Sequence, residues 1–139
     1  MNFEVKYESN FTLSKINKYL NDQKTSIVEY LVSLGHSKEL ALALLKFDES
    51  NTSAIWLEQD STPFAVSCFS IKGKMAVVYF TTCDIQEHED LIYNELDKFL
   101  KSQNCTHIKQ IVSLKDTDII EKLKRKGFNQ EFINLFKKI

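Results

Sequence analysis

The pattern of apolar and polar positions changes from helical to strand-like about one third of the way along the chain. Residues 3–7 alternate apolar and polar side chains, as in a half-buried strand, and apolar side chains then recur at helical spacing up to residue 47. From residue 53 the chain is rich in β-branched and aromatic side chains, in three runs separated by turn-like residues. These runs, at 54–58, 64–71 and 75–82, predict an antiparallel meander.

The second half of the chain returns to alternating helices and strands. A helix is predicted over 90–102, a strand over 108–114, a helix over 116–126 and a final strand over 128–136. One proline and three glycines leave no flexible linker, so residues 1–139 are expected to form a single domain. The fold class is therefore α/β (α+β), a mixed, mostly antiparallel sheet of about six strands flanked by helices.

Polar residues and glycines mark the expected ends of the helices. Ser26 and Glu29 have the spacing of a capping box and predict the start of a new helix, which Gly35 ends. The helix before that box is expected to bury Leu13, Ile16 and Leu20. A third helix is expected to start near Ser37. In the second half, Asp116 is expected to cap the last helix and Gly127 to end it.

Composition and charge exclude several classes of function. Hydrophobic residues make up 43% of the chain, enough for one core, and the net charge of −1 gives no field to attract nucleic acid or an anionic membrane. The longest apolar runs are far shorter than the roughly 20 residues of a spanning helix. The acidic N-terminal residues do not resemble a signal peptide, so a cytoplasmic location is expected.

The cysteines and histidines give no indication of a disulfide framework or a metal site. Both residue types are scattered, and the three cysteines are odd in number, as expected for free thiols in a reducing compartment. Cys83 follows a predicted strand, but no base is identified near it, and a plain thiol is the favoured interpretation. No metal is expected.

The element order and one sequence segment carry a resemblance to a known family. The segment DTDIIEKLKRKGF, from Asp116 to Phe128, ends in the Gly-Phe pair that closes the last helix of the GNAT acyltransferases. The strand at 75–82 and the helix from Asp90 occupy the place of that family's cofactor-binding strand and helix. The chain therefore resembles the GNAT superfamily over nearly its whole length. The resemblance implies transfer of an acyl group from acetyl-CoA to an amine of a small molecule or a protein.

The resemblance also implies a set of cofactor-binding residues. In the family, free backbone groups of the strand hold the pantetheine arm, and the next helix N-terminus holds the pyrophosphate. The corresponding residues here are Tyr79, Phe80, Thr81, Thr82, Gln86 and His88.

Two departures from the family pattern affect this expectation. The loop at 84–90 has no glycine and carries four carboxylates, each of which would cost on the order of 1 kcal/mol beside a phosphate at about 4 Å in water. Leu123 stands where the family has a proton-donating Tyr, and Asp116 stands where it has an Asn. The catalytic residues are therefore unknown, with Tyr79 and Tyr93 as alternative hydroxyls.

Several alternatives remain open at this stage. The acidic loop is interpreted mainly as helix-dipole complementation, or else as a site for an amine, and the basic run at 122–126 as a solvated face. A GNAT-like domain that binds a partner without CoA is the alternative function. The early chain end leaves room for a strand from a second subunit, so a homodimer is also open. Residues 27–45 further resemble two helices of a ubiquitin-associated domain, whose third helix would have to lie at 53–57.

Overall fold

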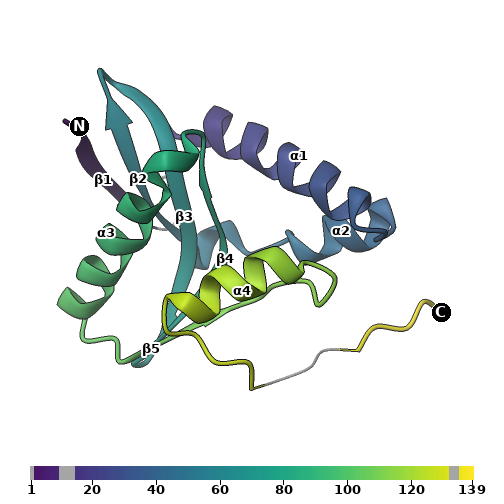
Figure 1. The fold of residues 1–139 in the computed structure, drawn as a ribbon. Coiled ribbons are helices and arrows are strands. Elements are labelled where there is room, and N and C mark those ends of the chain that lie inside the picture. Colours follow the sequence, from purple (N-terminus) through teal and green to yellow (C-terminus); the bar gives the residue numbers. More distant parts are fainter. Residues whose placement is uncertain (1, 10–14, 132–134) are drawn as a thin grey trace.

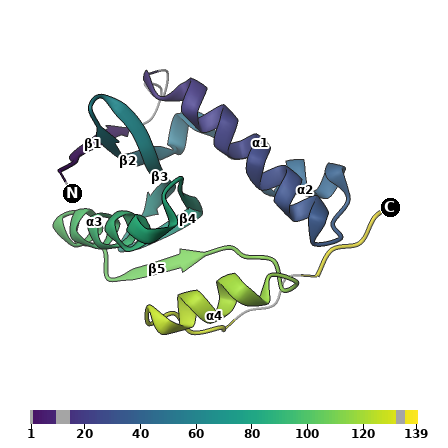
Figure 2. The ribbon, with the colours of Figure 1, turned by 45° about the horizontal axis from the view of Figure 1, so that its top comes forward.

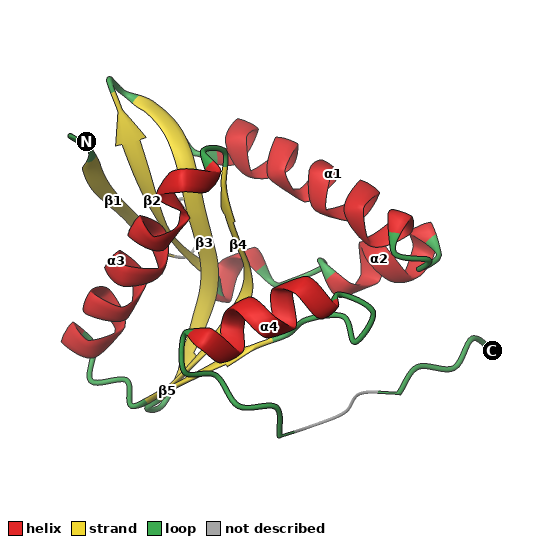
Figure 3. Cartoon of the chain, viewed as in Figure 1, coloured by secondary structure: helices red, strands yellow, loops and turns green. Residues whose placement is uncertain are grey.

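A computed structural model describes residues 2–9, 15–131 and 135–139 and shows a sheet with helices on both faces (Figures 1 and 3). The strands are β1 (Glu4–Ser9), β2 (Ser53–Gln59), β3 (Thr62–Lys72), β4 (Met75–Cys83) and β5 (His107–Gln110). The helices are α1 (Asn17–Ser33), α2 (Lys38–Leu44), α3 (Glu89–Ser102) and α4 (Thr117–Arg125), with the short 3-10 helices η2 (Glu49–Asn51) and η3 (Gln86–His88). Within the described ranges, no helix is long and apolar enough to cross a membrane.

The strands lie in the sheet in the order in which they occur in the sequence, from β1 to β5. Neighbouring strands from β1 to β4 are antiparallel, which confirms the predicted meander, and β4 and β5 are parallel. Asp60 and Ser61 have φ of 52° and 64°, so the β2–β3 turn uses two left-handed residues, as tight hairpins do. The helix α3 provides the crossover that a parallel pair requires.

Each face of the sheet is covered by two helices (Figure 2). On one face, Leu20 of α1 and Ala41 of α2 belong to a buried cluster with Trp56 and Val66 of the sheet. On the other face, a second buried cluster combines sheet residues with apolar positions of α3 and α4 that recur at helical spacing: Ile92, Leu96, Leu100 and Leu123. Because strand side chains alternate between faces, β3 contributes to both cores.

The first long helix differs from the sequence prediction. The structure has one continuous α1 where the capping box at Ser26 predicts a new start, and the Ser26 hydroxyl instead donates to the carbonyl oxygen of Asp22 at 3.1 Å. No proline or glycine interrupts this stretch, so the helical hydrogen bonds continue through it and Ser26 bonds back along the helix. The predicted end is confirmed, because Gly35 has φ of +99° and its N–H donates to the Val32 carbonyl at 2.9 Å. Leu13 lies outside the described residues.

The local signals of the two later helices are confirmed. Ser37 caps α2 by accepting from the backbone N–H of Leu40 at 3.2 Å, and Asp116 caps α4 in the same way through Ile119 at 3.1 Å. The structure excludes the ubiquitin-associated alternative and confirms the hairpin predicted at this point, because residues 53–57 are part of the strand β2, which pairs with β3.

The predicted strands after α3 are shorter or absent. The strand predicted at 108–114 ends at Gln110, because the chain then turns toward the start of α4. The strand predicted at 128–136 is not seen in its described part, since residues 128–131 and 135–136 are in coil. With only four residues in β5, little ladder is available to hold a further strand. The described sheet therefore has five strands where about six were expected.

Candidate functional site

The parallel ladder between β4 and β5 ends half-way along β4. Its last register pair is Val78 with Gln110, and β5 ends there, whereas β4 continues to Cys83 paired with β3. In the described part of the chain, residues 79–82 therefore have no strand on the side away from β3. Backbone N–H and C=O groups along such an edge are free to bind another extended chain or a ligand.

A β-bulge lies at the point where the two strands part. Cys68 of β3 faces Phe80 and Phe69 faces Val78, so Tyr79 is an extra residue without a register partner. The bulge also changes the alternation of β4, because Val78 lies in the core below α3 whereas Phe80 lies in the core below α1 and α2. Thr81 then faces Ser67, and the two hydroxyls are hydrogen-bonded at 2.9 Å.

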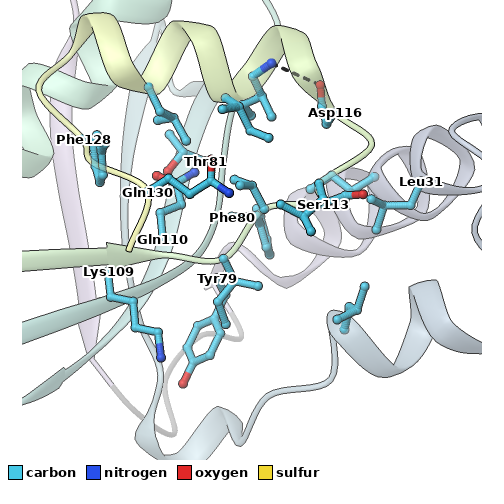
Figure 4. Close-up of a pocket in the computed structure, with 18 of the residues that line it drawn as sticks. Leu31, Tyr79, Phe80, Thr81, Lys109, Gln110, Ser113, Asp116, Phe128 and Gln130 are labelled. Carbon is cyan, nitrogen blue, oxygen red and sulfur yellow. Dashed lines mark hydrogen bonds between the residues drawn. The ribbon is translucent and has the colours of Figure 1, made fainter. Parts of the chain in front are cut away.

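A cavity of about 680 Å³ lies against this free edge (Figure 4). Aliphatic side chains of α1 and α2 form one wall, the end of β4 forms the next, and the chain from β5 through α4 to the tail closes the rest. Such a volume is typical of small-molecule sites. In Figure 4, Thr81, Gln110 and Gln130 lie below α4, whereas the side chains of Tyr79 and Lys109 extend away from them.

Few polar side chains face one another across the cavity. His36, which follows α1, is hydrogen-bonded through Nε2 to the Ser113 hydroxyl at 2.5 Å, so the loop between α1 and α2 is joined to the segment after β5. Lys115 Nζ donates to the Gly35 carbonyl at 3.3 Å across the same gap. The buried Asp116 carboxylate is used as the α4 cap.

A second, smaller cavity of about 430 Å³ lies between the first turn of α3 and the last turn of α4. Lys122 of α4 pairs with Glu89 of α3 at 2.6 Å, and Lys126 pairs with Asp90. The lining contains as many cations as carboxylates: Gln86, Glu87, Glu89, Asp90, Lys122, Arg125 and Lys126. The α4 cations thus offset much of the negative charge of the loop.

Several solved structures of acetyltransferases have a fold similar to that of this chain. PaiA N-acetyltransferase of Thermoplasma acidophilum, in complex with coenzyme A, matches with a TM-score of 0.75 at 12% identity, over 96% of this chain and 94% of that protein. The acetyltransferase YycN of Bacillus subtilis matches with a TM-score of 0.71 at 12% identity, over 98% of this chain and 99% of that protein. An aminoglycoside acetyltransferase from an uncultured soil metagenomic sample, in complex with sisomicin, matches with a TM-score of 0.63 at 8% identity, over 99% of this chain and 96% of that protein.

The chain has the GNAT fold. At such low identities the similarity establishes the fold alone. No protein-family model matches the sequence, and a search of curated proteins gave no match.

Within the GNAT fold, the residues proposed for the cofactor lie in two separate places. Residues 79–82 all line the large cavity, and Gln86 lines the smaller one. His88 immediately precedes α3 and lines neither of these two cavities. None of the acidic-loop residues 84–90 lines the large cavity, and the first carboxylate of the loop, that of Asp84, accepts a hydrogen bond from the Gln23 side chain at 3.2 Å.

The tyrosines considered as proton donors are not free in the large cavity. Ser70 donates its hydroxyl proton to the Asn51 carbonyl at 2.6 Å, so Tyr79 must donate its own proton to Ser70, at 3.0 Å. Tyr93 does not line the cavity; burial and the Glu89 carboxylate raise its pKa to about 12. Leu123 is buried in the cavity wall and has no proton to donate.

Burial also raises the pKa of the Cys83 thiol, and its Sγ donates to the Ile85 carbonyl at 3.1 Å. A raised pKa reduces the thiolate fraction and so opposes a nucleophilic role.

Two pairs of residues at these sites were missed by sequence reasoning. His36 and Ser113 are 77 positions apart, and nothing in the local pattern of either residue indicates the other. The sequence pattern favours a solvated face for Lys122 and Lys126, whereas in the structure both are half-buried and paired with α3. Their spacing of four does place them on one side of a helix, which could have suggested a shared partner.

The ion pair between Lys126 and Asp90 leads to a titration prediction. The Lys126 ammonium donates a hydrogen bond to Asp90 and holds the pKa of that carboxyl below its ordinary value. A depressed carboxyl pKa stabilises the fold near neutral pH, and this contribution is lost as the pH falls through the folded-state pKa. We expect Lys126→Met to raise the pKa of Asp90 toward the ordinary range in an NMR titration. Lys124→Met on the same helix is the control; an equal shift there would contradict a specific pair.

Proposed function

We propose that the chain is an N-acyltransferase that takes an acyl group from acyl-CoA, such as acetyl-CoA, and transfers it to an amine. The observation that carries the proposal is the free edge of β4 at 79–82, which forms one wall of the large cavity. The match to PaiA with coenzyme A and to an aminoglycoside acetyltransferase with sisomicin supports it. Both of those proteins have the same fold as this chain.

The described residues fit a CoA thioester at two points. The pantetheine arm carries amide groups, and the backbone groups of Tyr79, Phe80, Thr81 and Thr82 that point away from β3 can bond to them as a neighbouring strand would. Gln86, with the cations of the smaller cavity, can hold the phosphates, and His88 lies just before the α3 N-terminus. When bound, CoA supplies the acyl group as a thioester that is open to attack by an amine.

The chain's own groups can assist the transfer in two ways. An attacking amine must lose a proton, and the His36 imidazole, oriented by its bond to Ser113 in the cavity wall, can accept it. The bulge at Tyr79 leaves backbone groups outside the β3–β4 register, and an N–H there can donate to an oxygen on which negative charge develops.

A binding domain without CoA is the second candidate function. Two observations favour it: Leu123 offers no proton, and the pairs that Lys122 and Lys126 make with α3 span the place where the phosphates would lie. Binding of CoA would then compete with both ion pairs.

Calorimetric titration of the purified chain with acetyl-CoA and with longer acyl-CoAs tests the proposal. Saturable binding at micromolar concentration, followed by release of free CoA thiol when an amine is added, is the expected result. If no acyl-CoA gave a heat of binding or raised the melting temperature, the acyltransferase proposal would be contradicted. A binding domain without CoA would then remain as the candidate function.

Two substitutions in the loop before α3 test where the phosphates bind. Gln86→Ala removes a donor and is expected to weaken CoA binding. Glu87→Lys replaces a repulsive charge by an attractive one and is expected to strengthen binding about 30-fold, corresponding to roughly 2 kcal/mol for a change of two unit charges in water. Calorimetry with acetyl-CoA measures both. A change in the same direction for the two variants would show that this loop does not face the phosphates.

A further inference from the structure

Apart from Tyr30, the wall that α1 and α2 present to the large cavity is made of aliphatic side chains. They recur at intervals of four within each helix, which places them on one face: Ile27, Leu31, Leu40 and Leu44. These residues are only half-buried, whereas the fully covered positions of the same helices, such as Leu20 and Ala41, pack on the sheet. Apolar surface left open to a cavity is typical of a ligand site, since a ligand would remove it from water.

The cavity offers little negative charge. Only Asp116 and Glu131 carry carboxylates among the described residues that line it. Asp116 is buried and accepts the hydrogen bond that caps α4, and Glu131 is exposed on the chain after α4. The acidic loop could have attracted a polyamine, but it binds Gln23 and the α4 lysines and does not line this cavity.

The charged side chains that do line the cavity are mainly cations. Lys109, Lys115 and Lys124 are exposed at its rim. A ligand with several ammonium groups would meet these cations, and would have to bury charge against leucines without a counter-ion, which is strongly unfavourable. An apolar environment also favours the neutral form of an amine, which is the form that attacks an acyl group.

We propose that the acceptor is a small molecule with a single amine and an apolar body, which packs against Ile27, Leu31, Leu40 and Leu44. This inference rests on the proposed acyl transfer. The amine end lies toward His36 and Ser113, the hydrogen-bonded pair that joins the end of α1 to the segment after β5, and attacks the acyl carbon. A C–N bond forms as the C–S bond breaks; the amine proton leaves and the thiolate takes up a proton, giving an amide and a free thiol.

Binding of two unlike amines to the wild-type chain is the first test. Tryptamine is the apolar probe and spermidine the polycationic one, each titrated by calorimetry with and without acetyl-CoA. We expect tryptamine to bind at least 10-fold more tightly than spermidine. Equal affinity, tighter spermidine binding, or no binding of tryptamine in either condition would overturn the inference.

A matched pair of variants on α2 locates the site. Leu44→Asp places a carboxylate in the aliphatic wall, whereas Leu42→Asp places it on the exposed side of the same helix, where the leucine is 53% exposed. Leu44→Asp is expected to weaken tryptamine binding at least 10-fold and to strengthen spermidine binding, and Leu42→Asp to change neither. Thermal melting of both variants checks that they fold, and the same response from both would overturn the assignment.

Titration with CoA esters tests the acyltransferase proposal separately from the proposed acceptor class. Binding of acetyl-CoA without any preference for tryptamine would leave the acyltransferase proposal standing and remove the acceptor class. Binding of tryptamine by a chain that binds no acyl-CoA would remove the acyltransferase proposal, and the role of acceptor with it. If lauroyl-CoA binds more than 10-fold more tightly than acetyl-CoA and displaces tryptamine, the apolar wall holds the acyl chain and the inference is wrong.

Discussion

Leu123→Tyr is expected to raise kcat for acyl transfer roughly 100-fold above that of Leu123→Phe, the lower end of what a positioned general acid contributes. Leu123 lies in the wall of the large cavity, and the resemblance of the sequence to GNAT enzymes assigns it to the position of their proton-donating tyrosine. The two tyrosines that the sequence offers as alternatives are unsuited, because Tyr79 donates to Ser70 and Tyr93 does not line the cavity. A hydroxyl at position 123 would supply the missing proton.

Comparison with the phenylalanine variant distinguishes the effect of the tyrosine hydroxyl from the effect of the aromatic ring. Both rings overfill a buried position and are expected to lower the free energy of unfolding by about 1–3 kcal/mol. Release of free CoA thiol, followed with a thiol reagent at saturating acetyl-CoA and tryptamine, measures kcat. Equal rates for the two variants, with acetyl-CoA bound in both, would show that proton donation from this position does not limit the reaction.

Phe69→Ala is expected to lower the free energy of unfolding by about 3–5 kcal/mol, which is a large part of the stability of a domain of this size. Phe69 is fully buried in the core below α3, and its ring centroid lies 5.8 Å from that of Phe99. Removal of the ring leaves a cavity beside the bulge in β4, because Phe69 pairs with Val78. Urea unfolding followed by circular dichroism measures the change.

Ile71→Ala on the same strand is the control for that experiment. Ile71 is 39% exposed, so its loss is expected to cost no more than about 0.5–1 kcal/mol. If the two variants unfolded at similar urea concentrations with the same dependence on urea, the core below α3 would not be the main source of stability.

The features predicted correctly from the sequence are those that depend on a few neighbouring residues. Asp116 caps α4 because its own carboxylate reaches the N–H three residues on, and Gly35 and Gly127 end helices because a left-handed backbone costs glycine little. Alternation and composition similarly located β2, β3 and β4. Such signals are local, so one sequence carries them.

The errors and omissions have a different physical origin. The capping box at Ser26 was a genuine local signal, but an uninterrupted helix satisfied the same backbone groups and α1 continued through it. The bulge at Tyr79 depends on how β3 and β4 align, and the bond between His36 and Ser113 depends on where α1 and β5 end. These features are set by tertiary contacts, which no short stretch of the sequence contains.

The bulge at Tyr79 divides β4 into two halves with different neighbours. Before it, Val78 belongs to the same core as Phe69; after it, Phe80 turns to the opposite face and lines the large cavity. Substitutions before the bulge should therefore register in unfolding experiments, and substitutions of the half-buried Thr81 and Thr82 after it in the choice of ligand. One strand could thus acquire new acceptor preferences over evolution while the packing that keeps the domain folded stays unchanged.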